Sequence, residues 1–319
     1  VIFVGGKQYI NDEIEIGVLA EFIVYINMLT WPVAAVGWVT SVVQEAEASQ
    51  KRINKFLNQK VEIKNGIGVK KSFNGEIVFE NVTLIYPETN TKALDNLSFK
   101  IKAGEKVGIV GKVGSGKSSL LNLINRLYDV DEGNVLIGGS NIKDFKLDKL
   151  RSLIGNVMQN PFLFSESIKD NLLFGKIDAT KEEIEKACKN AAIHKTINSF
   201  KNGYDTILGE RGLTLSGGQI QRVSIARALI KNPQFFLFDD CLSAVDLDTE
   251  NKILKNIKVI CENKTTIMVS NRISSIKDSD KIFVLENGKI IETGNHKTLM
   301  ENKNYYSHLF NRQQNEKKY

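Results

Sequence analysis

One run of eight residues carries the clearest chemistry in this 319-residue chain. Its spacing is G-x-x-x-x-G-K-[ST], the pattern of a loop whose backbone N–H groups wrap nucleotide phosphates. Lys117 would reach the β- and γ-phosphates, and the Ser118 hydroxyl would ligate Mg²⁺. The run lies between an apolar strand and a helix start, which is the context the loop requires, so an ordinary glycine-rich turn is the weaker interpretation. The nucleotide-binding residues predicted here are Gly111, Lys112, Val113, Gly114, Ser115, Gly116, Lys117, Ser118 and Ser119.

An acidic pair follows a second apolar strand. Residues 235–238 read Phe-Phe-Leu-Phe, which predicts a strand buried on both faces, and Asp239 and Asp240 come directly after it. A carboxylate at the carboxyl end of such a strand can hold Mg²⁺ beside a phosphate loop. We therefore assign Asp239 as a metal ligand. Without the phosphate loop, the same run would read as an ordinary strand and a polar turn.

A five-residue motif narrows the class of nucleotide-binding protein. Residues 215–219 read Leu-Ser-Gly-Gly-Gln and precede a stretch, 221–230, that we expect to form an amphipathic helix. Small residues at a helix N-terminus leave backbone N–H groups free for an anion. With the phosphate loop, this signature motif resembles that of ATP-binding cassette (ABC) transporters of the exporter type, in which membrane spans precede the ATPase. The resemblance implies ATP and Mg²⁺ as ligands, and it implies that the motif faces the γ-phosphate held by an opposing subunit through Ser216, Gly217, Gly218 and Gln219.

Further positions match the same family one at a time and in the family's order. The resemblance implies that Tyr86 stacks on adenine and that Gln159 contacts Mg²⁺ and couples the site to the membrane helices. It also implies that residues 243–246, Ser-Ala-Val-Asp, signal across the dimer. The predicted metal ligands are thus Ser118, Gln159 and Asp239. The predicted catalytic residues are Lys117, Gln159, Asp239, Asp240 and Asn271.

Two positions depart from the family pattern, and both belong to the predicted hydrolytic site. Where the family has Glu as the general base on the attacking water, this chain has Asp240, which is shorter by about 1.5 Å. Where the family has a His bonded to the γ-phosphate, this chain has Asn271, which can donate a hydrogen bond but cannot carry a proton. Misplacement of that size can cost roughly a hundredfold in rate. We therefore predict a site that binds ATP but hydrolyses it slowly; the alternative is that both residues are tolerated and turnover is near normal.

The intact signature motif indicates a second chain. In the family, two ATP molecules lie between two ATPase domains, and each signature completes the opposing site. The combination found here resembles the slow-site half of bacterial heterodimeric multidrug exporters, so we predict as partner a second half-transporter that has Glu and His at the two positions. A homodimeric exporter with sluggish sites is the second hypothesis. A soluble ABC-type ATPase acting on nucleic acid or ribosomes is the third.

An apolar segment precedes these motifs. Residues 22–43 contain no Asp, Glu, Lys or Arg, and about 20 such residues cross a bilayer as a helix. Acidic residues precede the segment and Lys51, Arg52 and Lys55 follow it, which places its carboxyl-terminal side in the cytosol. We expect residues 1–58 to be the end of a transmembrane domain, with its last one to two spans and a helical cytosolic extension, and we expect an upstream part to be missing. A buried helix of a soluble protein is the weaker alternative, because such helices are usually shorter and amphipathic.

The elements around the motifs are those of an α/β P-loop NTPase domain. We expect an ABC ATPase domain at 76–319, with a helical subdomain at about 160–225, after a linker at 59–75. Strands are expected at 78–84, 97–101, 106–110, 235–238 and 265–270, a hairpin at 281–292, and helices at 117–127 and over most of 170–200.

Composition and charge limit which partners and which cellular compartment are expected. The net charge of +6 is mild and Lys and Glu are interspersed, so we expect a solvated surface and no nucleic-acid partner. Three scattered cysteines favour a reducing compartment over a disulfide framework. We expect a multi-pass protein of the plasma membrane with its ATPase domain in the cytoplasm. Drugs, lipids and peptides all stay open as the transported substrate.

Overall fold

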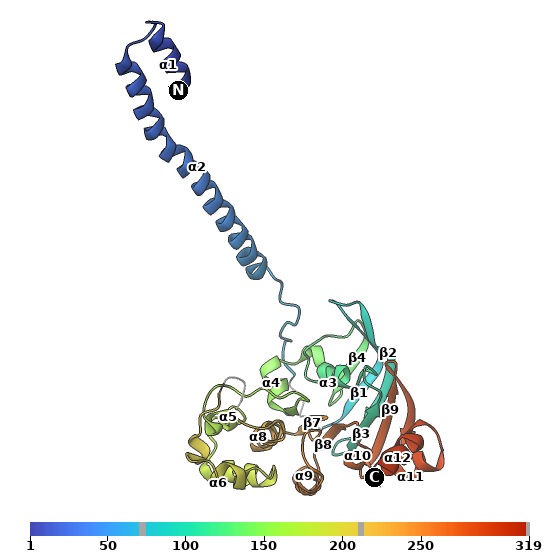
Figure 1. Ribbon diagram of the computed structural model, residues 1–319. Helices are drawn as coiled ribbons and strands as arrows, with labels where there is room; N and C mark the ends of the chain where they lie inside the picture. Colours follow the sequence, from blue (N-terminus) through green and yellow to red (C-terminus); the bar gives the residue numbers. More distant parts are fainter. Residues whose placement is uncertain (70–74, 210–213, 317–319) are drawn as a thin grey trace. The chain divides into compact units, whose positions relative to one another are not determined.

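The computed structural model describes residues 1–69, 75–209 and 214–316, and the chain divides into two compact units. These units are Val1–Glu62 and Ile63–Tyr319. The first contains two helices, α1 (Ile2–Ile10) and α2 (Ile16–Leu57) (Figure 1). Of the linker expected at 59–75, residues 59–69 form neither helix nor strand, and residues 70–74 lie outside the described residues.

Helix α2 continues without a break from the apolar segment into the polar one. It runs for 42 residues, contains Pro32, and none of its residues is buried. Within the apolar part, Thr30 and Thr40 donate their hydroxyl hydrogens to carbonyl oxygens one turn back, each at 2.8 Å, which satisfies these polar groups inside the helix itself. Among the described residues, α2 is the one helix whose length and composition would let it cross a membrane. The expected helical extension beyond the apolar segment is confirmed, and the crossing itself stays a prediction.

Two β-sheets form the framework of the second unit. A four-stranded antiparallel sheet has the order β2-β1-β4-β5, and a six-stranded sheet has the order β10-β9-β3-β8-β7-β6. In the larger sheet β9, β3, β8, β7 and β6 run parallel, and β10 is antiparallel to β9. The strands are β1 (Ile77–Tyr86), β2 (Thr91–Ile101), β3 (Lys106–Gly111), β4 (Glu132–Ile137), β5 (Ser140–Asn141), β6 (Ile154–Val157), β7 (Phe235–Asp239), β8 (Thr265–Val269), β9 (Lys281–Glu286) and β10 (Lys289–Gly294).

The larger sheet is covered on both faces, which explains the apolar run that predicted β7. Successive side chains of a strand point to opposite faces. Phe235 and Leu237 lie in a core shared with the four-stranded sheet, whereas Phe236 and Phe238 lie in a second core shared with the helices on the other side. A parallel strand buried on both faces is apolar at every position. The predicted strand at 235–238 is therefore confirmed.

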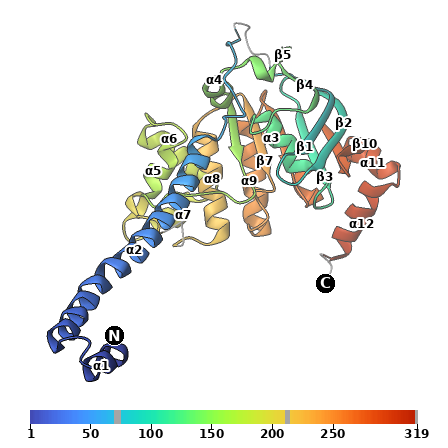
Figure 2. The ribbon, with the colours of Figure 1, turned by 90° about the horizontal axis from the view of Figure 1, so that it is seen from above.

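Helices α5, α6, α7 and α8 gather at the end of the domain away from the four-stranded sheet (Figures 1 and 2). This places a group of helices where the sequence predicts a helical subdomain; residues 210–213 of that range lie outside the described residues. The helices of the second unit are α3 (Lys117–Ile124), η1 (Ile142–Asp144), α4 (Leu147–Ser152), α5 (Ile168–Leu173), α6 (Lys181–Asn190), α7 (His194–Asn198), η2 (Gly203–Asp205), α8 (Gly217–Ile230), α9 (Leu247–Ile260), α10 (Ile273–Ile276), α11 (His296–Glu301) and α12 (Tyr305–Glu316).

Three expectations about these elements need correction. Helix α3 ends at Ile124, before the expected end at residue 127, because Arg126 adopts a left-handed φ of 48° that a helix cannot continue. Strand β2 begins at Thr91, well before the expected residue 97, because it pairs with β1 along most of its length. Helix α8 is not amphipathic, because it is packed on all sides by the sheet and its neighbours. Its buried residues are Gln221, Val223, Ser224, Ile225, Ala226, Ala228, Leu229 and Ile230.

Candidate nucleotide site

The parallel strands bring the predicted site residues to one edge of the six-stranded sheet. The phosphate loop follows β3, Gln159 follows β6, the acidic pair closes β7, and Asn271 follows β8. The carboxyl ends of parallel strands meet at the same edge, where ligands of α/β proteins bind. Segments far apart in the sequence therefore form one site.

Backbone geometry in the phosphate loop requires its glycines. Gly114 and Gly116 have positive φ angles of 81° and 99°. A Cβ on Gly116 would lie 2.5 Å from the carbonyl oxygen of Ala93, so only glycine fits there. Helix α3 begins at Lys117 without a side-chain cap, which leaves its first N–H groups free for an anion. In addition, Ser115 Oγ is one of the two buried side-chain polar atoms without a hydrogen-bond partner among the described residues, so the loop fits a phosphate group.

Lys117 lies folded over this loop. Its Nζ donates to the carbonyl oxygens of Gly111 and Lys112, each at 2.8 Å. Burial lowers the pKa of Lys117, and the negative charges of Asp239 and Asp240 oppose that change. Its ammonium group is thus held between the loop and the acidic pair, where the predicted phosphate contacts would form.

Two of the three predicted metal ligands contact each other. Asp239 accepts a hydrogen bond from the Ser118 side chain, and burial raises the pKa of this carboxyl group more than the hydrogen bond and Lys117 lower it. Gln159 is exposed beyond β6, whose Val157 is in register with Phe238 of β7. The described residues contain no group of three or more His, Cys, Asp or Glu side chains that could hold a metal. One carboxylate, a hydroxyl and phosphate oxygens form a donor set that suits Mg²⁺, which rarely takes an all-protein cage.

The two departures from the family pattern contact each other directly. Asn271 Nδ2 donates to Asp240 Oδ2 at 2.9 Å, and the Asn271 backbone N–H donates to Asp240 Oδ1 at 3.3 Å. Asp240 is 8 % exposed and has a left-handed φ of 41°. Asn271 thus donates to both oxygens of the carboxylate and Ser270 Oγ donates to Oδ1 at 3.5 Å, which holds the carboxylate toward the end of β8.

The predicted adenine contact is positioned by two neighbours. Tyr86 is half-buried; its hydroxyl is 2.9 Å from Ser119 Oγ, and its ring meets that of Tyr128 edge to face, with centroids 5.0 Å apart. The contact with Ser119 links the end of β1 to the first turn of α3, next to the phosphate loop.

We expect the ring of Tyr86, and not its hydroxyl, to contribute to nucleotide affinity. Tyr86→Ala should raise the Kd for ATP about tenfold, because stacking of a base on an aromatic ring is worth roughly 1–3 kcal/mol. Tyr86→Phe keeps the ring and should stay within about twofold of the natural chain. Titration with a fluorescent ATP analogue measures both. Equal losses in the two variants would show that the bond to Ser119 is what matters.

The signature motif caps its own helix. Ser216 Oγ accepts from the Gln219 backbone N–H at 3.4 Å, and Gln219 Oε1 accepts from the Ser216 backbone N–H at 2.8 Å, which together form a capping box. A Cβ on Gly218 would lie 2.6 Å from the carbonyl oxygen of Ala244, so the motif packs against the loop at 243–246. The Gln219 side chain, predicted as a nucleotide contact, is thus engaged in holding the motif.

Sequence reasoning missed a polar network that joins these parts. Arg272 donates to Glu250 Oε2 at 2.6 Å and to the carbonyl oxygen of Ser243 at 3.0 Å. Gln221 of α8 donates to Ser243 Oγ at 3.2 Å and accepts from the Ala244 backbone N–H at 3.1 Å. The residue after Asn271 is thereby connected through the loop at 243–246 to the signature helix. No sequence motif predicts these contacts, because the residues that form them are more than twenty positions apart in the sequence.

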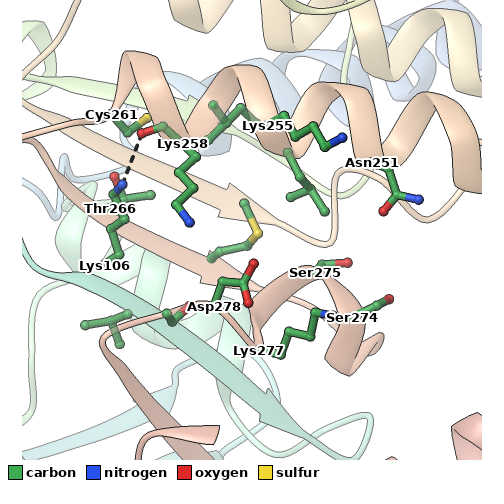
Figure 3. Close-up of a pocket in the computed structure, with 15 residues that line it drawn as sticks. Lys106, Asn251, Lys255, Lys258, Cys261, Thr266, Ser274, Ser275, Lys277 and Asp278 are labelled. Atoms are coloured by element: carbon green, nitrogen blue, oxygen red, sulfur yellow. Dashed lines mark hydrogen bonds between the residues drawn. The ribbon is translucent and has the colours of Figure 1, made fainter.

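A separate cavity of about 450 Å³ lies between α9, α10 and the amino end of β3 (Figure 3). Lys106, Lys258, Lys277 and Asp278 are among its lining residues. It lies beside the start of β3, whereas the phosphate loop follows the end of that strand. The cavity is therefore not part of the nucleotide site.

The parallel sheet, the phosphate loop and the acidic end of β7 define a P-loop nucleotide-binding domain, and comparison with known proteins identifies its family. Residues 94–243 match the model of the ABC transporter family. The multidrug resistance-like ATP-binding protein MdlA of Buchnera aphidicola subsp. Schizaphis graminum is 41% identical over 313 residues, which cover 98% of this chain and 54% of MdlA. The uncharacterized ABC transporter ATP-binding protein YknU of Bacillus subtilis is 39% identical, with coverage of 97% and 53%.

A solved structure supports the same assignment. A bacterial Atm1-family ABC exporter with ATP bound matches with a TM-score of 0.80 and 35% identity, over 91% of this chain and 51% of the exporter. The chain spans about half the length of the curated relatives it matches. It has an ABC ATPase P-loop domain with the fold of an Atm1-like exporter, and an ATPase domain of this family binds ATP, normally with Mg²⁺.

Proposed function

We propose that this chain is one half of an ABC exporter of the plasma membrane, and that its own site holds ATP and hydrolyses it slowly. The observation that carries this proposal is the direct bond between Asp240 and Asn271. A general base must accept a proton from water, and here the residue in the base position is bound by the residue in the switch position. The Asn271 side chain does not take up a proton at neutral pH, so protonation of Asn271 cannot free Asp240 from this bond.

The signature motif supports a difference between the two nucleotide sites of the proposed dimer. Its capping box and its packing on the loop at 243–246 are intact. In the proposed dimer this motif faces the nucleotide held by a second half-transporter, so hydrolysis would occur chiefly in the site built on that partner's phosphate loop. ATP binding closes the two domains, and hydrolysis at the partner's site opens them again.

An exposed apolar surface next to Gln159 offers a site for a protein contact. Phe164 stacks on Phe174 with ring centroids 4.3 Å apart and meets Phe162 edge to face at 5.0 Å. All three rings are exposed, as is Met158, and a cavity of about 380 Å³ lies beside them. Exposed aromatic groups of this kind mark contact sites. We assign this surface to a protein contact that would transmit domain closure within the assembled exporter, which would carry a drug, lipid or peptide across the bilayer.

The test is to purify the full-length protein alone and with candidate partners. Alone, it should bind MgATP and turn it over slowly, because both sites of a homodimer would contain the Asp240–Asn271 pair. Co-expression with a half-transporter that has Glu and His at these positions should restore rapid, substrate-stimulated hydrolysis. Brisk hydrolysis by the protein alone would instead support a homodimeric exporter and would sink the slow-site proposal.

A further inference from the structure

The C-terminal helix α12 contacts two of the loops that form the nucleotide site. Gln313 Nε2 donates to the carbonyl oxygen of Asn271 at 2.7 Å, and Gln313 Oε1 accepts from the Ile273 backbone N–H at 2.9 Å. At the other end of the helix, Lys112 of the phosphate loop places its ammonium group 5.6 Å from the ring centroid of Tyr305. One short helix thus touches the segment after β8 and the segment after β3.

Helix α12 is held in place by contacts with the rest of the domain, so it can hold Gln313 in a set position. Tyr306 is fully buried, and its hydroxyl is 2.8 Å from His296 Nδ1 at the start of α11. The Tyr306 backbone N–H donates to Glu292 of β10 at 3.2 Å, and the His296 ring packs edge to face on Phe310. The position of Gln313 is consequently set by the β9–β10 hairpin and α11, which take no part in the predicted chemistry.

We propose that Gln313 is a positioning residue for the switch segment, residues 271–273, and that the C-terminal helix controls ATP hydrolysis through it. A carboxamide is the side-chain group that donates and accepts at once in a fixed plane, and this segment offers one acceptor and one donor. Fixing the Asn271 carbonyl and the Ile273 N–H orients the backbone between them. That backbone carries the Asn271 amide, which is bound to Asp240, and the Arg272 side chain, which is bound to Ser243.

Through the Asn271 and Arg272 side chains, Gln313 would affect both the nucleotide site on this chain and the site that the signature motif completes. Asn271 belongs to the site on this chain, whereas Arg272 holds the loop at 243–246, against which the signature motif packs. The inference therefore rests on the ATPase activity of the domain and not on whether the partner is a second protein or a second copy. Failure of the slow-site proposal would leave it intact.

The decisive variant is Gln313→Glu, which makes the hydrogen bonds from residue 313 to residues 271–273 depend on pH. A protonated carboxyl group can donate to the Asn271 carbonyl and accept from the Ile273 N–H, as the amide does. The ionised carboxylate can only accept, so it would face the carbonyl oxygen without a donor. Since the ordinary pKa of a Glu side chain is about 4.3, the carboxylate predominates near neutral pH; relative to the natural chain, hydrolysis by the full-length transporter should be about tenfold lower at about pH 8, through the loss of the bond to the Asn271 carbonyl, and should recover as the pH falls toward about 5. The KM for ATP should stay within about twofold, since Gln313 does not touch the phosphate loop.

Gln314→Glu is the matched control. Gln314 is the next residue on the same helix and is exposed, so the substitution adds the same charge without touching residues 271–273. Its pH profile should follow the natural chain. Gln313→Ala removes donor and acceptor together and should lower kcat by about the same factor at every pH. A pH profile for Gln313→Glu that matches Gln314→Glu, or a Gln313→Ala variant with full kcat, would overturn the proposal.

Discussion

Asp240→Glu combined with Asn271→His is expected to raise ATP hydrolysis at this chain's site about a hundredfold. Glu extends the carboxylate by one bond, about 1.5 Å, toward an attacking water. His at the switch position can carry the charge that Asn271 cannot. The rate is measured as phosphate release from the full-length protein purified alone, where no partner contributes a site of its own.

The single variants decide whether the two positions act as a pair. The side chains are bonded at 2.9 Å, so their effects should not be additive. Asp240→Glu alone keeps a switch residue that engages the base, and Asn271→His alone keeps a base that is too short. We expect each to give less than about a tenth of the combined gain. An unchanged rate in the double variant, with ATP affinity retained, would show that another feature limits turnover.

Ser216→Asp is expected to reduce hydrolysis by the assembled transporter about a hundredfold while this chain's own ATP binding persists. Asp is as good an N-cap as Ser, so helix α8 should keep its start. In the proposed dimer its carboxylate would nevertheless face the γ-phosphate of the opposing site, where a negative charge would repel the nucleotide strongly in a partly desolvated gap. The measurement is phosphate release by the complete dimer, with ATP binding to this chain's site followed separately.

Ser216→Asn provides the matched control for the charge. Asn has nearly the shape of Asp and caps helices equally well, but it is neutral and can donate to a phosphate. It should reduce the rate by less than about tenfold. Thermal unfolding should be the same for both variants within about 2 °C, since a cap is retained in each. If Asn and Asp reduced hydrolysis equally, the motif would act through helix packing and not through its electrostatic effect on the opposing nucleotide.

Local patterns in the sequence were enough for much of the fold. The apolar run at 235–238 predicted a doubly buried strand, and the glycine spacing at 111–118 predicted a loop that ends in a helix N-terminus; both are present. Element boundaries were less well predicted. The end of α3 depends on the left-handed backbone of Arg126, and the burial of α8 depends on neighbours far along the chain. Periodicity records which residues are apolar, and it does not record how many sides of a helix will be covered.

The sequence by itself determined the chemistry available to this protein. Phosphate-loop spacing and the signature motif are local, because a helix N-terminus and its glycines are adjacent in the chain, and they carry the ATPase assignment. The departures at Asp240 and Asn271 were visible in the same way. Only the tertiary structure decided that these two side chains bind each other, that Arg272 contacts the loop under the signature motif, and that Gln313 holds residues 271–273. Those contacts join residues 29 to 42 positions apart, and their partners become neighbours only when parallel strands align their carboxyl ends and the C-terminal helix packs beside them.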